Sequence, residues 1–161
     1  MRAIGLAVSV SGKRTTVAAV VLNDNTSPGA PFDEVAVTVE ASFEVKADQT
    51  DVAVQLGDTA KNISGRLRAL TPEVVVVRRA DRPMKPSNQE GPRLRLLMEG
   101  AITGAAHEVI AETRIRNGKD CGSAFGASKD ILDAAASSLH GGRFKEATAA
   151  ALSGLAEGRR V

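Results

Sequence analysis

Four consecutive valines, residues 74–77 of the segment PEVVVVRRADRP (72–83), constrain the fold more than any other feature of this chain. An uninterrupted apolar run of this length is typical of a strand buried on both faces, as in the parallel sheets of α/β proteins. The run leads directly into Arg78 and Arg79. Because ligands of α/β folds collect where parallel strands end, these arginines mark a candidate site.

The first 47 residues predict three strands in an antiparallel meander. The expected strands are residues 3–12, 14–23 and 34–47. The first two are joined at Gly12-Lys13, a turn signal, and therefore form a hairpin. In the third, Val35, Val37 and Val39 share one face, while polar residues interrupt the other face. This alternation predicts a strand that is partly open to water.

Helical periodicity begins at residue 50, where Thr50 or Asp51 is placed to cap a helix that Pro72 ends. The pattern then predicts a strand over 73–77, a helix over 93–108, a strand over 109–115, and helices over 128–142 and 143–158. Residues 80–92 contain three prolines and predict a long, mobile loop. Residues 117–127, broken by glycines, predict a loop or short turn.

This order of elements predicts one α/β domain over residues 1–161, with 143–158 as an additional C-terminal helix. Sequential strands favour antiparallel pairing, whereas helices between the later strands imply parallel crossovers. The expected architecture is a mixed five-stranded sheet in the order 3-2-1-4-5, with strand 2 antiparallel to the rest and helices on its flanks.

Composition narrows the function classes. Aromatic residues make up 2% of the chain, without Trp or Tyr, which disfavours base-stacking platforms for single strands. The formal charge of +2 is too small to indicate a nucleic-acid partner by itself. Cys121 is the single cysteine, so no internal disulfide can form, which fits a reducing cytosol. No apolar run reaches the length of a membrane helix. We therefore expect a cytoplasmic protein without a membrane partner.

Several segments resemble the RuvC-type Holliday-junction resolvases, which have the ribonuclease H-like fold. AIGLAVSVSG is similar to the family's first strand, PEVVVVRR to its fourth strand, LRLLMEGAITGAA to the helix that follows, and SKDILDAAASSL to its last helix. The resemblance implies carboxylates from the first strand, the end of the fourth strand and the last helix. Together they would hold two divalent ions about 4 Å apart for phosphodiester hydrolysis.

Carried over position by position, that set of carboxylates is incomplete. The first-strand acid falls at Ala7, or at Ser9 after a slip of two residues, and the fourth-strand acid falls at Arg78. Only Asp130 and Asp133, the candidate catalytic residues of the last helix, are carboxylates. We therefore expect no metal site, and predict that Arg78 forms a bidentate ion pair with Asp130 or Asp133 in its place.

Alternative interpretations remain open for these residues. Asp130 and Asp133 are also what a helix start favours, because acids there interact well with the helix dipole. Glu99 keeps a one-metal variant open. A cluster of cations surrounds the long loop and is either a solvated edge or a phosphate-binding surface. Its members are Arg78, Arg79, Arg82, Lys85, Arg93 and Arg95.

The preferred interpretation is a RuvC-like domain with a degenerate active site that binds DNA or RNA, or a protein partner, and that can form a homodimer. It requires no cofactor. The first alternative is a divergent nuclease that uses Asp130 and Asp133 and depends on Mg²⁺ as its cofactor. The second alternative is a structural subunit of a larger assembly, docked through its apolar terminal helix.

Overall fold

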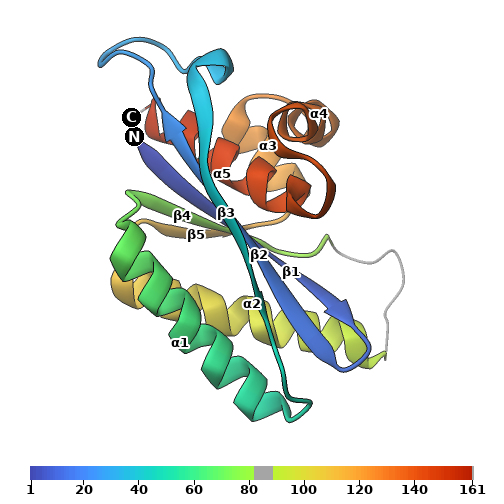
Figure 1. Ribbon diagram of the computed structural model, residues 1–161. Helices are drawn as coiled ribbons and strands as arrows, with labels where there is room; N and C mark the ends of the chain where they lie inside the picture. The colour runs from blue at the N-terminus through green and yellow to red at the C-terminus, as the bar shows by residue number, and fades with distance from the viewer. Residues whose placement is uncertain (82–88, 161) are drawn as a thin grey trace.

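A five-stranded mixed sheet lies between two layers of helices in the computed structural model, which describes residues 1–81 and 89–160 (Figure 1). The strands are β1 (Arg2–Ser11), β2 (Arg14–Asp24), β3 (Val37–Lys46), β4 (Val74–Arg78) and β5 (Thr113–Arg116). Their order is β3-β2-β1-β4-β5. β2 pairs antiparallel with β1 and β3, and β4 pairs parallel with β1 and β5. The predicted sheet order and strand directions are confirmed.

The α-helices of the described residues cover the two faces of this sheet. They are α1 (Val52–Leu70), α2 (Glu90–Val109), α3 (Gly118–Phe125), α4 (Lys129–His140) and α5 (Lys145–Gly158), with short 3-10 turns at Glu34–Ala36 and Gly142–Phe144. Figure 1 shows α1 and α2 together on one face and α3, α4 and α5 on the other. Each face has its own apolar core.

The valine run of β4 is buried on both faces, as the sequence predicts. Val75 and Val77 belong to the core beneath α1 and α2, whereas Val74 and Val76 belong to the core beneath α5. By the same alternation, Arg78 faces the side of the sheet that carries α3, α4 and α5. The arginine therefore points into the protein at the end of a buried strand.

The C-terminal helix α5 is the central helix of its layer, not an appended one. Every residue from Ala147 to Ala156 is buried, and α5 crosses β1 so closely that a Cβ at Gly5 would overlap the backbone of Ala147 and Ala151. Alanine-rich sequence allows this approach because its side chains are small. Because α5 is buried along most of its length, it does not offer the free apolar helix through which the structural-subunit alternative would dock on a partner.

Other differences from the sequence prediction have local causes. Residues 118–125 form helix α3 instead of a loop, because Asn117 accepts a hydrogen bond from the Asp120 N–H and Gly126 ends the helix in the left-handed region. β3 begins at Val37, and Val35 lies in the preceding 3-10 turn with 85% of its surface exposed. β5 is shorter than predicted because α2 continues to Val109.

The predicted long loop is only partly described. Residues 90–92 belong to the first turn of α2, where Pro92 is compatible with the helix because its missing N–H has no helical partner there. The prediction of mobility concerns mainly residues 82–88, which lie outside the described residues. In the described ranges, no helix combines the length and apolar character that crossing a bilayer requires.

Candidate functional site

The site predicted from the family resemblance lies where β1 and β4 run side by side. Ala7 of β1 is the register partner of Arg78 of β4, so the fold places the two family positions next to each other. Both are buried, Arg78 with 2% of its surface exposed. Two positions at which the resemblance implies acids thus hold a methyl group and a guanidinium.

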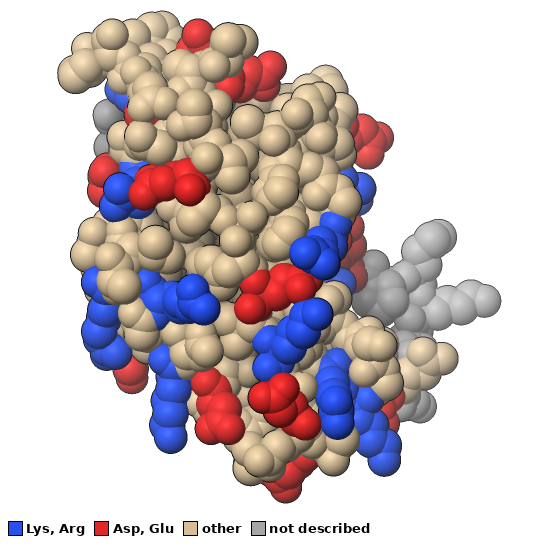
Figure 2. All heavy atoms as spheres, viewed as in Figure 1, with Lys and Arg blue, Asp and Glu red and all other residues tan. Residues whose placement is uncertain are grey.

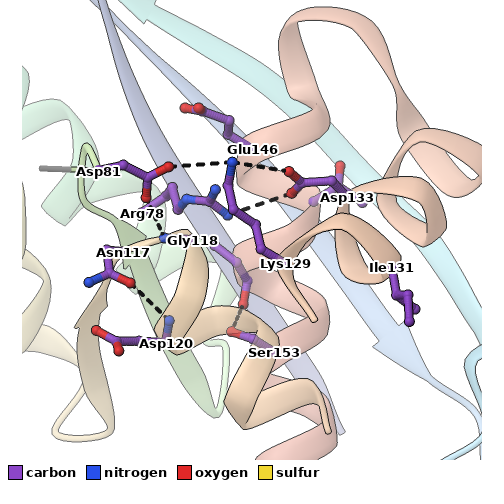
Figure 3. Close-up of polar contacts among 12 residues, drawn as sticks. Arg78, Asp81, Asn117, Gly118, Asp120, Lys129, Ile131, Asp133, Glu146 and Ser153 are labelled. Atoms are coloured by element: carbon purple, nitrogen blue, oxygen red, sulfur yellow. Dashed lines mark hydrogen bonds and ion pairs between the residues drawn. The ribbon is translucent and has the colours of Figure 1, made fainter. Parts of the chain in front are cut away.

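Arg78 faces Asp133 across the interior. Its Nη1 lies 3.9 Å from Asp133 Oδ1, and within the described part of the chain neither atom has a hydrogen-bond partner. The predicted ion pair to one of the two α4 aspartates is therefore present with Asp133, but as one long contact instead of a bidentate pair. Figure 3 shows the two side chains pointing toward each other from β4 and α4.

Lys129 connects two carboxylates around this pair. Its Nζ lies 3.4 Å from Asp81 Oδ2 and 3.7 Å from Asp133 Oδ2, and the Gly118 N–H donates to Asp81 Oδ1 at 2.9 Å. Burial is the largest influence on the pKa of Asp81 and raises it, but the Gly118 N–H, Lys129 and Arg78 together outweigh burial and lower the pKa. Arg78, Asp81, Lys129 and Asp133 form a four-charge cluster of two cations and two anions (Figure 3).

The close packing of the four-charge cluster leaves room only for a glycine at position 118. A Cβ at this position would collide with Arg78 Nη2 and with the Cδ and Cε atoms of Lys129. The first residue of α3 therefore provides the space in which the guanidinium and the lysine side chain lie. Neither Gly118 nor Lys129 was predicted as a site residue, although Lys129 and Asp133 have the i, i+4 spacing of a helical ion pair.

Asp130 of α4 and Cys121 lie in positions that fit structural roles. Asp130 is exposed in the first turn of α4, behind the Ser128 cap, which fits the helix-start interpretation and not the ion pair. Furthermore, α4 is not the last helix, because α5 follows and packs on β1.

Cys121 is buried, and that burial raises the pKa of its thiol, as expected for a thiol that is not a nucleophile.

These residues do not fit a pair of divalent cations. Over residues 1–81 and 89–160, no three His, Cys, Asp or Glu side chains gather closely enough to hold a metal ion. The two carboxylates of the four-charge cluster are contacted by Lys129, and the guanidinium of Arg78 lies beside Asp133. A cation at this position would meet two fixed positive charges.

A second group of charges lies at the start of α2. Arg95 Nε donates to Glu99 Oε1 at 2.8 Å, and its Nη2 lies 3.2 Å from Glu146 Oε2 on α5. The Ala80 N–H also donates to Glu99 Oε1. Glu99 is fully buried, and its Oε2 has no partner in the described ranges. Glu99 is therefore held by Arg95 and the Ala80 N–H, and in the described ranges it belongs to no group of three side chains that could ligate a metal.

The cations of the predicted basic cluster lie in different environments in the structure. Arg78 is inside the protein, which is incompatible with its predicted contact to a phosphate, and Arg95 is engaged by two glutamates. Arg79 and Arg93 line a cavity of about 780 Å³ together with Arg95, the β1–β2 hairpin and the first turns of α2. Arg82 and Lys85 lie outside the described residues.

Comparison with solved structures identifies the fold. Thermus thermophilus RuvC matches with a TM-score of 0.68 at 13% identity, covering 95% of this chain and 92% of that one. T. thermophilus RuvC in complex with a Holliday junction substrate matches with a TM-score of 0.64 at 14% identity, covering 95% and 91%. The yeast mitochondrial Holliday junction resolvase Ydc2 gives 0.50 at 12%, covering 98% and 77%. The chain has the RuvC-like ribonuclease H fold.

Sequence comparison gives no corresponding relative. No protein-family model matches the chain, and no curated protein matches its sequence. The likeness to the resolvases is therefore one of fold.

Proposed function

We propose that this protein is a RuvC-like nucleic-acid-binding module that has exchanged the two-metal centre of its fold for an internal charge cluster. The observation that carries the proposal is the buried guanidinium of Arg78, placed beside Ala7 at the carboxyl end of β4. A guanidinium at this position neutralises Asp133 without a metal ion, and its charge disfavours the cations that hydrolysis of a phosphodiester would need.

The basic surface beside the cluster supports nucleic acid as the ligand. Arg79 and Arg93 lie at the carboxyl edge of the sheet, next to the hairpin that carries Gly12. By contrast, Figure 2 shows acidic and basic side chains interspersed over the face that carries α1 and β3, an arrangement that does not favour a polyanion. We therefore place the nucleic acid at the carboxyl edge, the position at which α/β folds bind ligands.

Branched DNA is the first ligand to test, because a matching RuvC structure contains a Holliday junction substrate. We expect the protein to bind four-way junction DNA at low salt and to leave it uncut in Mg²⁺ or Mn²⁺. Gel-shift and cleavage assays on one labelled junction measure both properties. Absence of binding to junction, duplex and single-stranded DNA and to RNA at low salt rejects the nucleic-acid proposal.

The nuclease alternative predicts the opposite result in the same assay. If the protein cuts DNA with Mg²⁺ and Asp133→Asn abolishes the cutting while Asp130→Asn does not, the charge cluster is catalytic and the degenerate-site proposal is wrong. Because Asp133→Asn also disturbs Arg78, a folded state of that variant must be verified by circular dichroism before its activity is interpreted.

A further inference from the structure

One ion pair joins the two helix layers at the carboxyl edge of the sheet. Arg95 lies on α2 and Glu146 in the first turn of α5, and Figure 1 shows these two helices on opposite faces of the sheet. Arg95 Nη2 donates to Glu146 Oε2 at 3.2 Å. The contact lies outside both apolar cores, since the two side chains are 24% and 42% exposed. Glu146 is therefore an accessible carboxylate beside the surface where we place the nucleic acid.

The guanidinium of Arg95 is anchored on one side and held by Glu146 on the other. Its Nε donates to Glu99 Oε1 at 2.8 Å, and Glu99 is fully buried and also accepts from the Ala80 N–H at 2.9 Å. The interior of the protein therefore fixes this side. The Nη2 side is held by a partly exposed carboxylate, and such contacts are easily exchanged for water. Displacing Glu146 would leave the guanidinium in place, with its Nη2 side open.

This contact matters for the basic surface because Arg95 lines the 780 Å³ cavity together with Arg79 and Arg93. A carboxylate and a phosphate bind the same donors of a guanidinium, so they compete for them. In the structure two carboxyl groups face Arg95, and without Glu146 only one would remain. A phosphate that approaches Arg95 has to displace Glu146, which lowers the affinity of the surface for a polyanion.

We propose that Glu146 is an autoinhibitory residue, which weakens nucleic-acid binding by occupying the Nη2 side of Arg95 until a phosphate displaces it. This inference rests on the proposed function and adds to it a residue that opposes binding. The effect belongs to one contact and therefore requires Arg95. Simple repulsion between Glu146 and a phosphate would act whether or not Arg95 is present, so mutation separates the two explanations.

The test measures binding of the full chain to a labelled four-way junction by fluorescence anisotropy at low salt. Glu146→Gln should bind about two- to fivefold more tightly than the wild type, a modest gain because an exposed ion pair is weak. Glu108→Gln removes the same charge from the exposed last turn of α2 and should leave the affinity unchanged. Thermal melts followed by circular dichroism verify that both variants are folded.

The decisive comparison repeats Glu146→Gln in an Arg95→Gln background, which removes the cation but keeps a side-chain donor for the buried Glu99. We expect the double variant to bind no more tightly than Arg95→Gln alone. An equal gain in both backgrounds would assign the effect to repulsion and overturn the proposal. A wild type that binds the junction, with a Glu146→Gln variant that binds no more tightly, overturns this proposal and leaves the proposed function intact. If neither chain binds any nucleic acid, both proposals fail.

Discussion

Arg78 illustrates how one residue determines what the end of a strand can do. Burying a charged guanidinium without an anion beside it is costly, and the ion-pair partner of Arg78 in the described ranges is Asp133. Asp133 itself has a second partner in Lys129 and is 19% exposed. Arg78 therefore depends on Asp133 for its ion pair, whereas Asp133 would keep Lys129 as a partner if Arg78 were removed.

This inequality predicts an asymmetric response to mutation. Asp133→Asn removes the ion-pair partner of the buried Arg78 and should destabilise the fold by about 3 kcal/mol or more. Arg78→Met leaves Asp133 paired with Lys129 and should cost about 1 kcal/mol or less. Urea unfolding measures both free energies. Asp130→Asn, at the exposed start of α4, is the control and should change stability little. Equal destabilisation by Asp133→Asn and Arg78→Met would contradict this account of the cluster.

The close packing of α5 on β1 determines how the helices of its layer are arranged. It passes over β1 at Gly5, and alanine side chains along α5 allow the backbones to approach. At its end, Arg159 holds the loop that follows β2, because its Nε donates to Asp24 Oδ2 at 2.6 Å and its Nη2 donates to the Thr26 carbonyl at 2.7 Å. Packing along the helix and an ion pair at its end thus fix α5 at two places.

The close crossing predicts a large cost for one methyl group. Gly5→Ala places Cβ inside the contact distance of the Ala147 carbonyl, so α5 or β1 must move, and we expect the protein to be destabilised by about 2–3 kcal/mol. Gly57→Ala adds the same methyl group on α1, where no atom lies within 4 Å, and should stabilise the protein by about 0.5–1 kcal/mol. Thermal and urea unfolding of the two variants should differ in sign.

The ion pair at the end of α5 predicts an acid-dependent contribution to stability. Burial is the largest influence on the pKa of Asp24 and raises it, but hydrogen bonds from Arg159 and Thr26 and the charge of Arg159 outweigh it, so the pKa is lowered on folding. The pair therefore contributes its full stability above the unfolded pKa, about 3.9, and this contribution disappears as the pH falls through the lower folded value.

Asp24→Asn tests that contribution. The variant should be less stable than the wild type at pH 7, and the difference should shrink as the pH falls below about 4. Urea unfolding at a series of pH values measures it. A difference that stays constant down to the acid limit would show that the effect of the substitution comes from packing and not from ionisation.

At the scale of the whole molecule, the distribution of charge matters more than its sum. The net charge is only +2, and many cations are paired with carboxylates, including Arg95, Arg116 and Lys129. Arg79 and Arg93 lie at the carboxyl edge of the sheet and line the 780 Å³ cavity. Any nucleic-acid affinity should therefore depend on a few side chains and on salt.

Salt dependence gives the corresponding prediction. The slope of log affinity against log salt concentration scales with the number of phosphates that the protein neutralises, by about 1 per phosphate. The double substitution Arg79→Ala with Arg93→Ala should therefore flatten this slope by about 2. Arg68→Ala, which removes an exposed cation from α1, should leave the slope unchanged. Fluorescence anisotropy with a labelled junction measures these slopes. Equal slopes for the wild type and all the variants would show that the nucleic acid does not bind at the carboxyl edge.

The sequence by itself determined the order of elements, the sheet and the position of Arg78, because these follow from local periodicity and from strand alternation. The run 74–77 is typical of a strand buried on both faces, and the turn signal at Gly12-Lys13 favours a hairpin. The family resemblance placed Arg78 near the aspartates of residues 128–142, so an ion pair between them could be predicted. However, local patterns could not choose between Asp130 and Asp133, because both fit a helix start.

Only the tertiary structure decided which helix is central and how the charges are partnered. The alanine-rich segment 145–158 has the same local pattern whether it lies inside or outside, and its burial depends on the space left at Gly5. Likewise, Asp81, Gly118 and Lys129 come from three separate segments, and their meeting around Arg78 depends on how α3 and α4 fold back on the sheet. Contacts between distant segments carry no periodic signal in the chain, so they emerge only when the layers pack.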